Sequence, residues 1–266
     1  MACKWHGLII DDYNAVMPLP WRKKYGILYC YSPAFIQQLG LFGNTTAVPL
    51  HEIISAITTF SKYGDLFLNY GNAFMLPNIK AIPKTNFIIN LKEGYEAISN
   101  RYAKSLIIKL KKSSGNDFIY AESSHVKEAV QLYRSYIANR MPHVTQQDYE
   151  HFTALCQTLQ QQNDCFIRAI NNKEGILLAM SLFLKDAHRI YNMLPVTTHE
   201  GRKLNAQHFL IDSVIKEFAG QPVLFDFEGS DLPGVKTFYE NFLPQNQPYY
   251  LWHYNRLPFP LRLIKR

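Results

Sequence analysis

The sequence has no long hydrophobic run and few cysteines. Its longest mostly apolar run covers residues 176–184, which is far shorter than the 20 or so residues that a membrane-spanning helix needs. The first six residues, Met-Ala-Cys-Lys-Trp-His, do not follow the pattern of a secretory signal. The four cysteines, Cys3, Cys30, Cys156 and Cys165, include no Cys-x-x-Cys pair. These features predict a cytoplasmic protein with reduced thiols and no membrane span.

Motifs for metal binding and for several kinds of catalysis are also missing. The nine histidines form no His-Glu-x-x-His motif and no cluster with cysteines, so we expect no metal site. Neither a Gly-x-Ser-x-Gly elbow nor a Walker phosphate loop occurs. Cys156 falls on the apolar side of an expected helix, which argues against a role as nucleophile.

The composition indicates a folded basic protein. Of the 266 residues, 47% are hydrophobic, so the chain can bury a core without disulfides or metal. That length suggests one large domain or two small ones. There are 28 Lys and Arg residues against 21 Asp and Glu, a net charge of +7. This excess favours an anionic partner such as a nucleotide-linked donor, a tRNA or an acidic surface, although it also fits a general solubility charge.

The pattern of residues predicts the order of elements. The first ninety residues read as β-rich, with a hairpin over residues 5–19, a strand at 26–31 and a helix at about 49–62. A long helix is expected over 92–112, with Arg101, Lys104, Lys111 and Lys112 gathered on one side. The polar stretch 113–117 then marks the predicted boundary between units 1–115 and 116–266.

The second half shows a clearer pattern of predicted helices and strands. Two helices are expected first, and Thr145 and Asp148 form a capping box that opens the second. Three antiparallel strands follow, then a loop, a helix at 203–219, a strand at 221–229, a short helix at 234–242 and a last strand at 249–254.

This order resembles the GNAT acyltransferase fold, and several segments resemble FemAB-like proteins, a group that includes peptidoglycan aminoacyltransferases. Residues 224–230 and 233–239 (Leu-Phe-Asp-Phe-Glu-Gly-Ser and Pro-Gly-Val-Lys-Thr-Phe-Tyr) are similar to their last third. Residues 12–26 and 33–40 are similar to the first unit of bacterial members. The resemblance implies an α/β (α+β) fold of two GNAT-like units, each a mixed, mostly antiparallel sheet flanked by helices. The first unit is expected to lack its leading helices.

The resemblance also implies a function. The expected reaction is transfer of an acyl or aminoacyl group from an activated donor, either aminoacyl-tRNA or an acyl thioester such as acyl-CoA, to an amine acceptor. No tightly bound cofactor is expected. GNAT enzymes that use acetyl-CoA carry Arg/Gln-x-x-Gly-x-Gly/Ala before their long helix, whereas residues 201–207 read Gly-Arg-Lys-Leu-Asn-Ala-Gln. The missing glycines argue against simple acetyl-CoA, and the basic helix favours tRNA.

The donor is expected at the start of the helix after residue 202. A helix N-terminus offers free N–H groups and partial positive charge, which suit a phosphate. The candidate donor-binding residues are Gly201, Arg202, Lys203, Asn205 and Ala206. The alternative is an ordinary solvated helix start.

Three residues are candidates for the chemistry. Asp226 and Glu228 end a strand on one face, where two carboxylates can hold or deprotonate an amine. The alternative for either is to cap the turn or pair with an Arg or Lys. By resemblance, Tyr239 protonates the leaving group; its alternative is a core aromatic.

The acceptor is expected in a groove between the two units. Its candidate residues combine aromatic, basic and amide groups: Trp21, Arg22, Lys23, Tyr25, Gln37 and Gln38. The alternative places Trp21 in the core and leaves Arg22 and Lys23 solvated.

A second function class stays open, a binding module that kept the fold and lost catalysis. Whether the groove between strands 188–195 and 223–228 is open or filled distinguishes an enzyme from a binding module. Side chains that filled it would argue against an enzyme.

Overall fold

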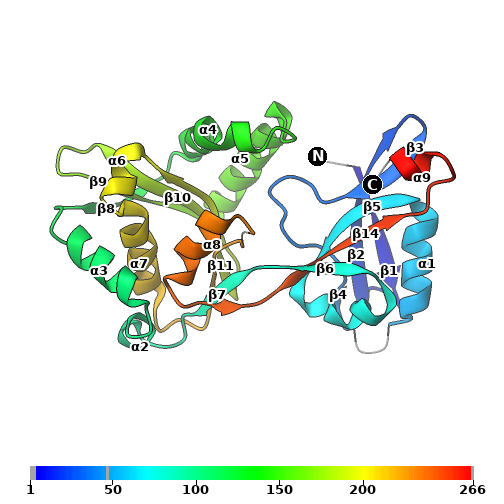
Figure 1. Cartoon of the computed structure of the whole chain (residues 1–266), viewed down its shortest axis with the longest axis horizontal. Coiled ribbons are helices and arrows are strands. Elements are labelled where there is room, and N and C mark those ends of the chain that lie inside the picture. The colour runs from blue at the N-terminus through cyan, green and yellow to red at the C-terminus, as the bar shows by residue number, and fades with distance from the viewer. Residues whose placement is uncertain (1–3, 46–47, 230, 265–266) are drawn as a thin grey trace. The chain divides into compact units, whose positions relative to one another are not determined.

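The structure is a computed structural model of the chain, and it describes residues 4–45, 48–229 and 231–264. The chain forms two compact units (Figure 1). Unit 1 consists of residues 1–85 and 247–266, and unit 2 of residues 86–246. Each unit is built on a mixed sheet with helices, so the predicted α+β class is confirmed. Within these described ranges, no helix combines the length and apolar character that a membrane crossing requires.

Unit 1 is built on a sheet with one short strand at its side. The order across the sheet is β1 (Lys4–Ile10), β2 (Ala15–Lys24), β3 (Ile27–Tyr31), β5 (Tyr63–Leu68), β14 (Tyr249–Asn255) and β6 (Ala81–Lys84), and β4 (Phe42–Gly43) pairs with β2. Helix α1 (Leu50–Phe60) contributes Ile53 and Ile57 to the core. The 3₁₀ helix η1 (Tyr70–Asn78) and the short α9 (Leu261–Ile264) complete the unit. The predicted hairpin, third strand and helix of this region are confirmed.

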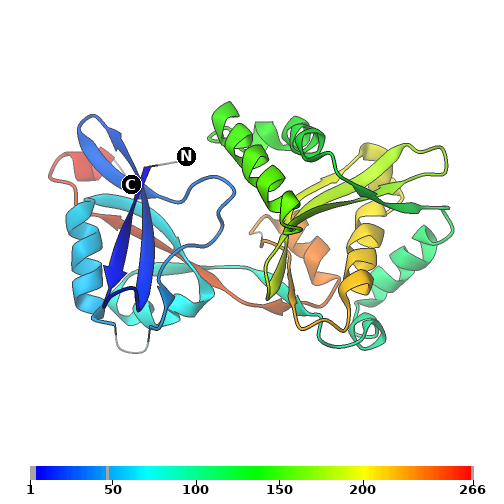
Figure 2. The same ribbon diagram turned by 180° about the vertical axis from the view of Figure 1, so that it is seen from behind.

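The sheet of unit 2 has the order β13 (Gln245–Asn246), β7 (Phe87–Asn90), β12 (Leu224–Asp226), β11 (Arg189–Thr197), β10 (Leu177–Lys185), β9 (Cys165–Asn171) and β8 (Ile119–Ser123). Helix α7 (Ala206–Phe218) packs on one face over β9 to β11, with α3 (Lys104–Ser113) against it. Helices α4 (Val126–Ile137) and α5 (Gln146–Gln161) pack on the other face (Figure 2). The remaining helices are α2 (Tyr95–Ser99), η2 (Ala138–Arg140), α6 (His199–Lys203) and α8 (Pro233–Glu240).

The structure divides the chain elsewhere than at the predicted boundary of 115/116. Strand β7 belongs to the sheet of unit 2, where it lies between β12 and β13. Its residues Phe87, Ile88 and Ile89 are all buried, as expected for a strand covered on both faces. The last strand, β14, was predicted in the second unit but pairs with β5 and β6 of unit 1. The chain therefore enters unit 2 at residue 86 and returns to unit 1 after residue 246.

The predicted single helix over 92–112 is wrong. It is two helices, α2 and α3, separated by residues 100–103. Ala103 has an extended backbone, and its N–H donates to the carbonyl of Asn241 at 2.9 Å. Tyr102 turns into the core at the same point. Because the helix breaks there, the predicted basic side is divided, and Arg101 pairs with Glu93 at 2.8 Å.

Candidate functional site

The sheet of unit 2 opens where β12 ends. Strands β11 and β12 pair in parallel over three residues, Arg189–Tyr191 against Leu224–Asp226. Beyond Tyr191, β11 continues to Thr197 without this partner. A cavity of about 590 Å³ lies at this opening, between β11, the segment after β12, the end of α6, the start of α7, the end of α4, and α8. Its volume is typical of small-molecule sites. Side chains therefore do not fill the groove that was expected between these two strands.

A β-bulge in β11 directs side chains into this cavity. Leu182 lies opposite Leu194, but Phe183 lies opposite Asn192, so Met193 is an extra residue in β11. Asn192 therefore shares a face with Phe183, and Thr197, opposite Ala179, lies on that same face toward α7. Without the extra residue, Asn192 and Thr197 would face opposite sides. Bulges of this kind re-aim side chains beside functional sites.

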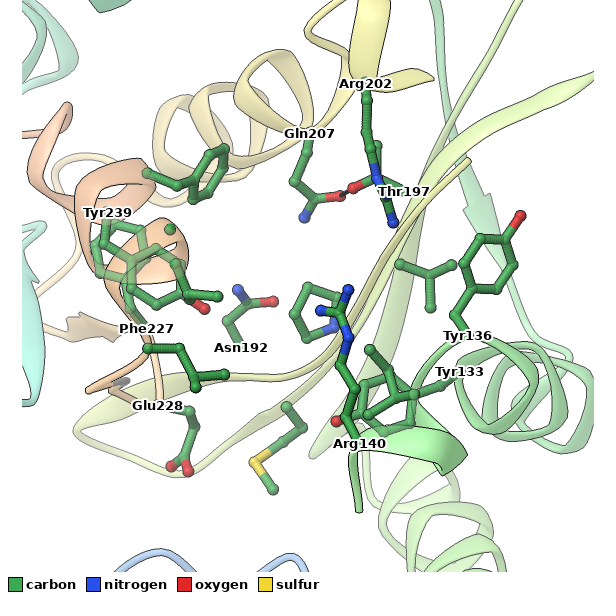
Figure 3. Close-up of a pocket in the computed structure, with 18 of the residues that line it drawn as sticks. Tyr133, Tyr136, Arg140, Asn192, Thr197, Arg202, Gln207, Phe227, Glu228 and Tyr239 are labelled. Carbon is green, nitrogen blue, oxygen red and sulfur yellow. Dashed lines mark hydrogen bonds between the residues drawn. The ribbon is translucent and has the colours of Figure 1, made fainter. Parts of the chain in front are cut away.

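Asn192 carries a buried amide in the wall of the cavity. Its exposed fraction is 1%, and within the described residues neither its Oδ1 nor its Nδ2 has a hydrogen-bond partner. Figure 3 shows the amide directed toward the space between Tyr239 and Gln207. A buried polar group without a partner costs about 1–3 kcal/mol, so such a group requires an explanation.

Tyr239 is placed in the cavity wall by α8. Its ring packs against Phe227 at 4.6 Å and Phe238 at 5.5 Å between centroids. Among the described residues, no group hydrogen-bonds its hydroxyl. Burial, together with the charges of Glu228 and Asp226, raises the pKa of Tyr239. The hydroxyl therefore stays protonated at neutral pH and is able to donate a proton or a hydrogen bond.

The two candidate carboxylates have different environments. Asp226 is fully buried, forms an ion pair with Arg189, and accepts a hydrogen bond from Asn86 Nδ2 at 3.1 Å. It does not line the cavity, so its geometry matches the structural alternative. Asp226 also accepts the backbone N–H of Glu228 at 2.8 Å, which holds Glu228 at a left-handed φ of 56°.

Glu228 is half-buried and lines the cavity. In Figure 3 its carboxylate points away from Gln207 and Asn192. Burial and the neighbouring Asp226 carboxylate raise the pKa of Glu228 to about 8. Such a carboxyl group can exchange a proton near neutral pH.

The candidate donor loop lies at the other side of the cavity. Gly201, Arg202 and Asn205 line it. Lys203 instead is exposed and pairs with Glu200 at 3.3 Å, and Ala206 is buried in the core. The predicted helix at 203–219 is α7, preceded by the separate short helix α6.

Asn205 explains how the loop turns without the expected glycine. With Arg202 as the first position of the GNAT pattern, Asn205 occupies the fourth, where the pattern has its first glycine. The φ of Asn205 is +57°. Asparagine tolerates this left-handed conformation better than most residues. Gly201 is needed for a different reason, because a Cβ there would lie 2.0 Å from the carbonyl oxygen of Leu178.

Three further polar residues of the cavity were not found from the sequence. Gln207 donates to Ser181 Oγ at 3.0 Å and accepts from Thr197 Oγ1 at 3.2 Å. His208 lies 3.3 Å from the Lys109 ammonium, and burial with this neighbouring charge lowers the pKa of His208 to about 4, so it is neutral at pH 7.

Arg140, from η2, is the third polar residue of the cavity that was not found from the sequence. In Figure 3, Arg140 and Arg202 extend toward the middle of the cavity from opposite sides. Both are exposed, and no ion pair to either is found within the described part of the chain. No local signal in the sequence indicates that these two arginines approach one cavity or that η2 lies beside it.

The predicted acceptor residues lie in unit 1, outside the cavity of unit 2. Trp21 packs near His6, with ring centroids 5.6 Å apart, and the guanidinium of Arg22 lies 4.4 Å from the ring centroid of Tyr31. Lys23 is exposed on β2, and Tyr25 is 91% exposed at the turn after β2. Gln38 donates to Gln37 at 2.8 Å. The acceptor groove at these residues stays a prediction.

Comparisons with known proteins give a match in structure and none in sequence. Neither the models of known protein families nor the curated proteins match this chain. FemX matches over 98% of this chain and 90% of its own, with 11% identity and a TM-score of 0.68. L-PGS from Bacillus licheniformis matches over 98% and 87%, with 12% identity and a TM-score of 0.59. A GCN5-related N-acetyltransferase from Kribbella flavida matches over 97% and 91%, with 10% identity and a TM-score of 0.51.

The chain has a FemAB-like fold of two GNAT-like units. Within this FemAB-like fold, the opening between β11 and β12 and the start of α7 belong to the second GNAT-like unit. No group of three His, Cys, Asp or Glu residues positioned for a metal ion is found in the parts that the structure describes.

Proposed function

We propose that unit 2 transfers an acyl or aminoacyl group from an activated donor to an amine. The observation that carries this proposal is the cavity between β11 and β12, where the Tyr239 hydroxyl has no hydrogen-bond partner among the described residues. Arg202 of α6 and Asn205 at the start of α7 line the same cavity. The similar structures support it, because FemX is an aminoacyl transferase and the Kribbella protein is an N-acetyltransferase.

The donor would lie along the α6–α7 side of the cavity. Both candidate donors, aminoacyl-tRNA and an acyl thioester such as acyl-CoA, carry phosphate groups. Arginine side chains bind phosphate with charge-assisted hydrogen bonds. Arg202 and Arg140 are the cavity residues that fit this role.

The reaction needs one bond to form and one to break. The amine nitrogen attacks the donor carbonyl carbon, and the bond from that carbon to the leaving oxygen or sulfur then breaks. Tyr239 gives its proton to the leaving atom, and the amine loses a proton to Glu228 through water, because the Glu228 carboxylate points away from Asn192. Asp226 acts indirectly, by holding the backbone that presents Glu228.

The alternative of a non-catalytic binding module has less support. Binding alone also needs an open cavity, but it does not need a protonated hydroxyl and a carboxyl group of raised pKa in the cavity wall. The open groove is compatible with both classes, and Tyr239 with Glu228 in its wall is the feature that favours the enzyme.

A donor panel tests the proposal. The full chain would be incubated with acetyl-CoA, long-chain acyl-CoA and a set of aminoacyl-tRNAs, each with amines, amino sugars and cell-wall precursors as acceptors. Mass spectrometry would detect a new amide. We expect enzyme-dependent transfer from one donor class. Absence of transfer from every donor would contradict the proposed function.

A further inference from the structure

We infer that Asn192 is a catalytic residue that binds the tetrahedral centre of the reaction, with Nδ2 donating to the oxyanion and Oδ1 accepting from the attacking nitrogen. The inference rests on the proposed function and adds to it a residue that the sequence did not indicate. It starts from the amide in the cavity wall, which is buried and has no hydrogen-bond partner in the part of the chain that the structure describes.

The buried position of the Asn192 amide lowers the stability of the fold. Asn192 is 1% exposed, and within the described residues both of its polar atoms lack a partner. The extra residue Met193 is what turns Asn192 onto the face of Thr197 and Gln207. A buried amide that served only stability would be expected to have partners, as Asn72 does: it is also 1% exposed, accepts from the N–H of Leu41 at 2.7 Å and donates to the carbonyl of Leu41 at 2.9 Å.

The other polar groups of the wall are already engaged or suited to other tasks. Gln207 is bonded to Ser181 and Thr197, and His208 is next to Lys109. The remaining wall is largely apolar, from Phe227, Phe238 and Val235 among others. In such surroundings, hydrogen bonds to a developing charge are stronger than they are in water. Asn192 is therefore well placed to contact the reacting atoms.

The shape of a carboxamide matches the tetrahedral centre. In Asn192, Oδ1 and Nδ2 are attached to one carbon. When the amine attacks, the N–C bond forms and the carbonyl electron pair moves to oxygen, so the oxyanion and the new N–H group are also attached to one carbon. The two groups can form a pair of parallel hydrogen bonds.

The product cannot keep both of these hydrogen bonds to Asn192. Once the bond to the leaving atom breaks and Tyr239 has protonated that atom, the product is a planar amide. In its trans form, the N–H and C=O point to opposite sides. Asn192 can then keep only one of the two bonds. An interaction that is stronger in the transition state than in the bound substrate or product accelerates the reaction.

The test compares Asn192→Leu and Asn192→Asp with the wild-type chain, using the donor and acceptor pair found in the panel. Asn192→Asp keeps the size and removes the Nδ2 donor. Both variants should lower kcat and kcat/KM by the same factor, about 10²–10³, and leave the KM for the donor unchanged.

Thermal melts separate this role from a structural one. Asn192→Leu should melt at or above the wild-type temperature, because an apolar group replaces an amide that has no partner among the described residues. Asn72→Leu is the control and should melt lower, because it strands the backbone groups of Leu41.

Each other outcome overturns the inference. Full activity of Asn192→Leu would show that the amide does not contact the reacting atoms. A loss of activity that follows a lower melting temperature would make Asn192 structural. In both cases transfer by the wild-type chain leaves the proposed function standing. Absence of transfer by the wild-type chain from every donor removes the proposed function and this inference together.

Discussion

Single residues in the cavity of unit 2 hold protonation states that burial controls. The pKa of Tyr239 is raised, that of Glu228 is raised to about 8, and that of His208 is lowered to about 4. At neutral pH the cavity therefore contains a protonated phenol, a carboxyl group that is only partly ionised and a neutral imidazole. An acid and a base can be present together only because their environments differ.

The raised pKa of Glu228 predicts how stability depends on pH. An unfolded Glu titrates at about 4.3, so the folded chain binds this proton more tightly, and ionisation of Glu228 lowers stability as pH rises from about 4 to about 8. Glu228→Gln cannot ionise. We expect its melting temperature to match the wild type near pH 4.5 and to exceed it near pH 8.5. A difference that is constant over this range, or larger in acid, would contradict the assigned environment.

At the level of elements, α6 and the turn that follows it shape the donor side of the cavity. Gly201→Ala would place a Cβ 2.0 Å from the Leu178 carbonyl oxygen. We expect urea unfolding to show a loss of about 1–3 kcal/mol, as is usual for overpacking. The control is Gly94→Ala, because nothing lies within 4 Å of a Cβ at Gly94. Equal stability of the two variants would show that the loop is free to shift.

The basic residues of α3 are candidates for contact with a tRNA donor. Lys104 and Lys111 are exposed, whereas Arg101 precedes α3 and pairs with Glu93. If tRNA is the donor, replacing Lys104 and Lys111 with Gln should weaken binding and reduce its dependence on salt, by about one phosphate contact per lysine. Arg101→Gln should change the salt slope less. Tight, salt-sensitive RNA binding that is unaffected by the two lysine changes would place the RNA elsewhere on the chain.

Local signals in the sequence predicted local structure. The capping box at Thr145 is present, with Thr145 Oγ1 accepting from the Asp148 N–H at 3.2 Å and Asp148 Oδ2 accepting from the Thr145 N–H at 2.8 Å. The break at Ala103 had no such signal, because it depends on Asn241, which is distant in the sequence. The same holds for the bulge at Met193, which is visible only in the pairing of β10 with β11. Asn192 was missed for that reason, whereas Tyr239 was predicted from the resemblance and Glu228 from its place at the end of a strand.

At the scale of the whole molecule, the chain passes from unit 1 to unit 2 and back. The polar stretch 113–117 looked like a boundary, yet it is a loop between α3 and β8 inside unit 2. Composition marks loops but does not show which sheet a strand joins. That information lies in long-range pairs such as Phe225 with Ile89 and Leu251 with Phe67.

Fragments test this division of the chain. Residues 86–246 contain β7 and the complete sheet of unit 2, so this fragment should unfold in one cooperative transition. Residues 116–266 lack β7 and the buried side chains Phe87, Ile89 and Leu91. We expect that fragment to aggregate or to melt without a cooperative transition in circular dichroism. A cooperative melt of 116–266 alone would contradict the division at residue 86.

Tyr239→Phe distinguishes acyl or aminoacyl transfer in the cavity of unit 2 from a purely structural role of this tyrosine. The change removes a hydroxyl that has no hydrogen-bond partner among the described residues and keeps the ring packed on Phe227. Transfer from the active donor should fall by about 10²–10⁴, with donor binding and melting temperature little changed. The matched control is Tyr254→Phe, a buried tyrosine of unit 1, which should keep full activity. Full activity of Tyr239→Phe, or a loss that only follows reduced stability, would contradict proton transfer by Tyr239 in this cavity.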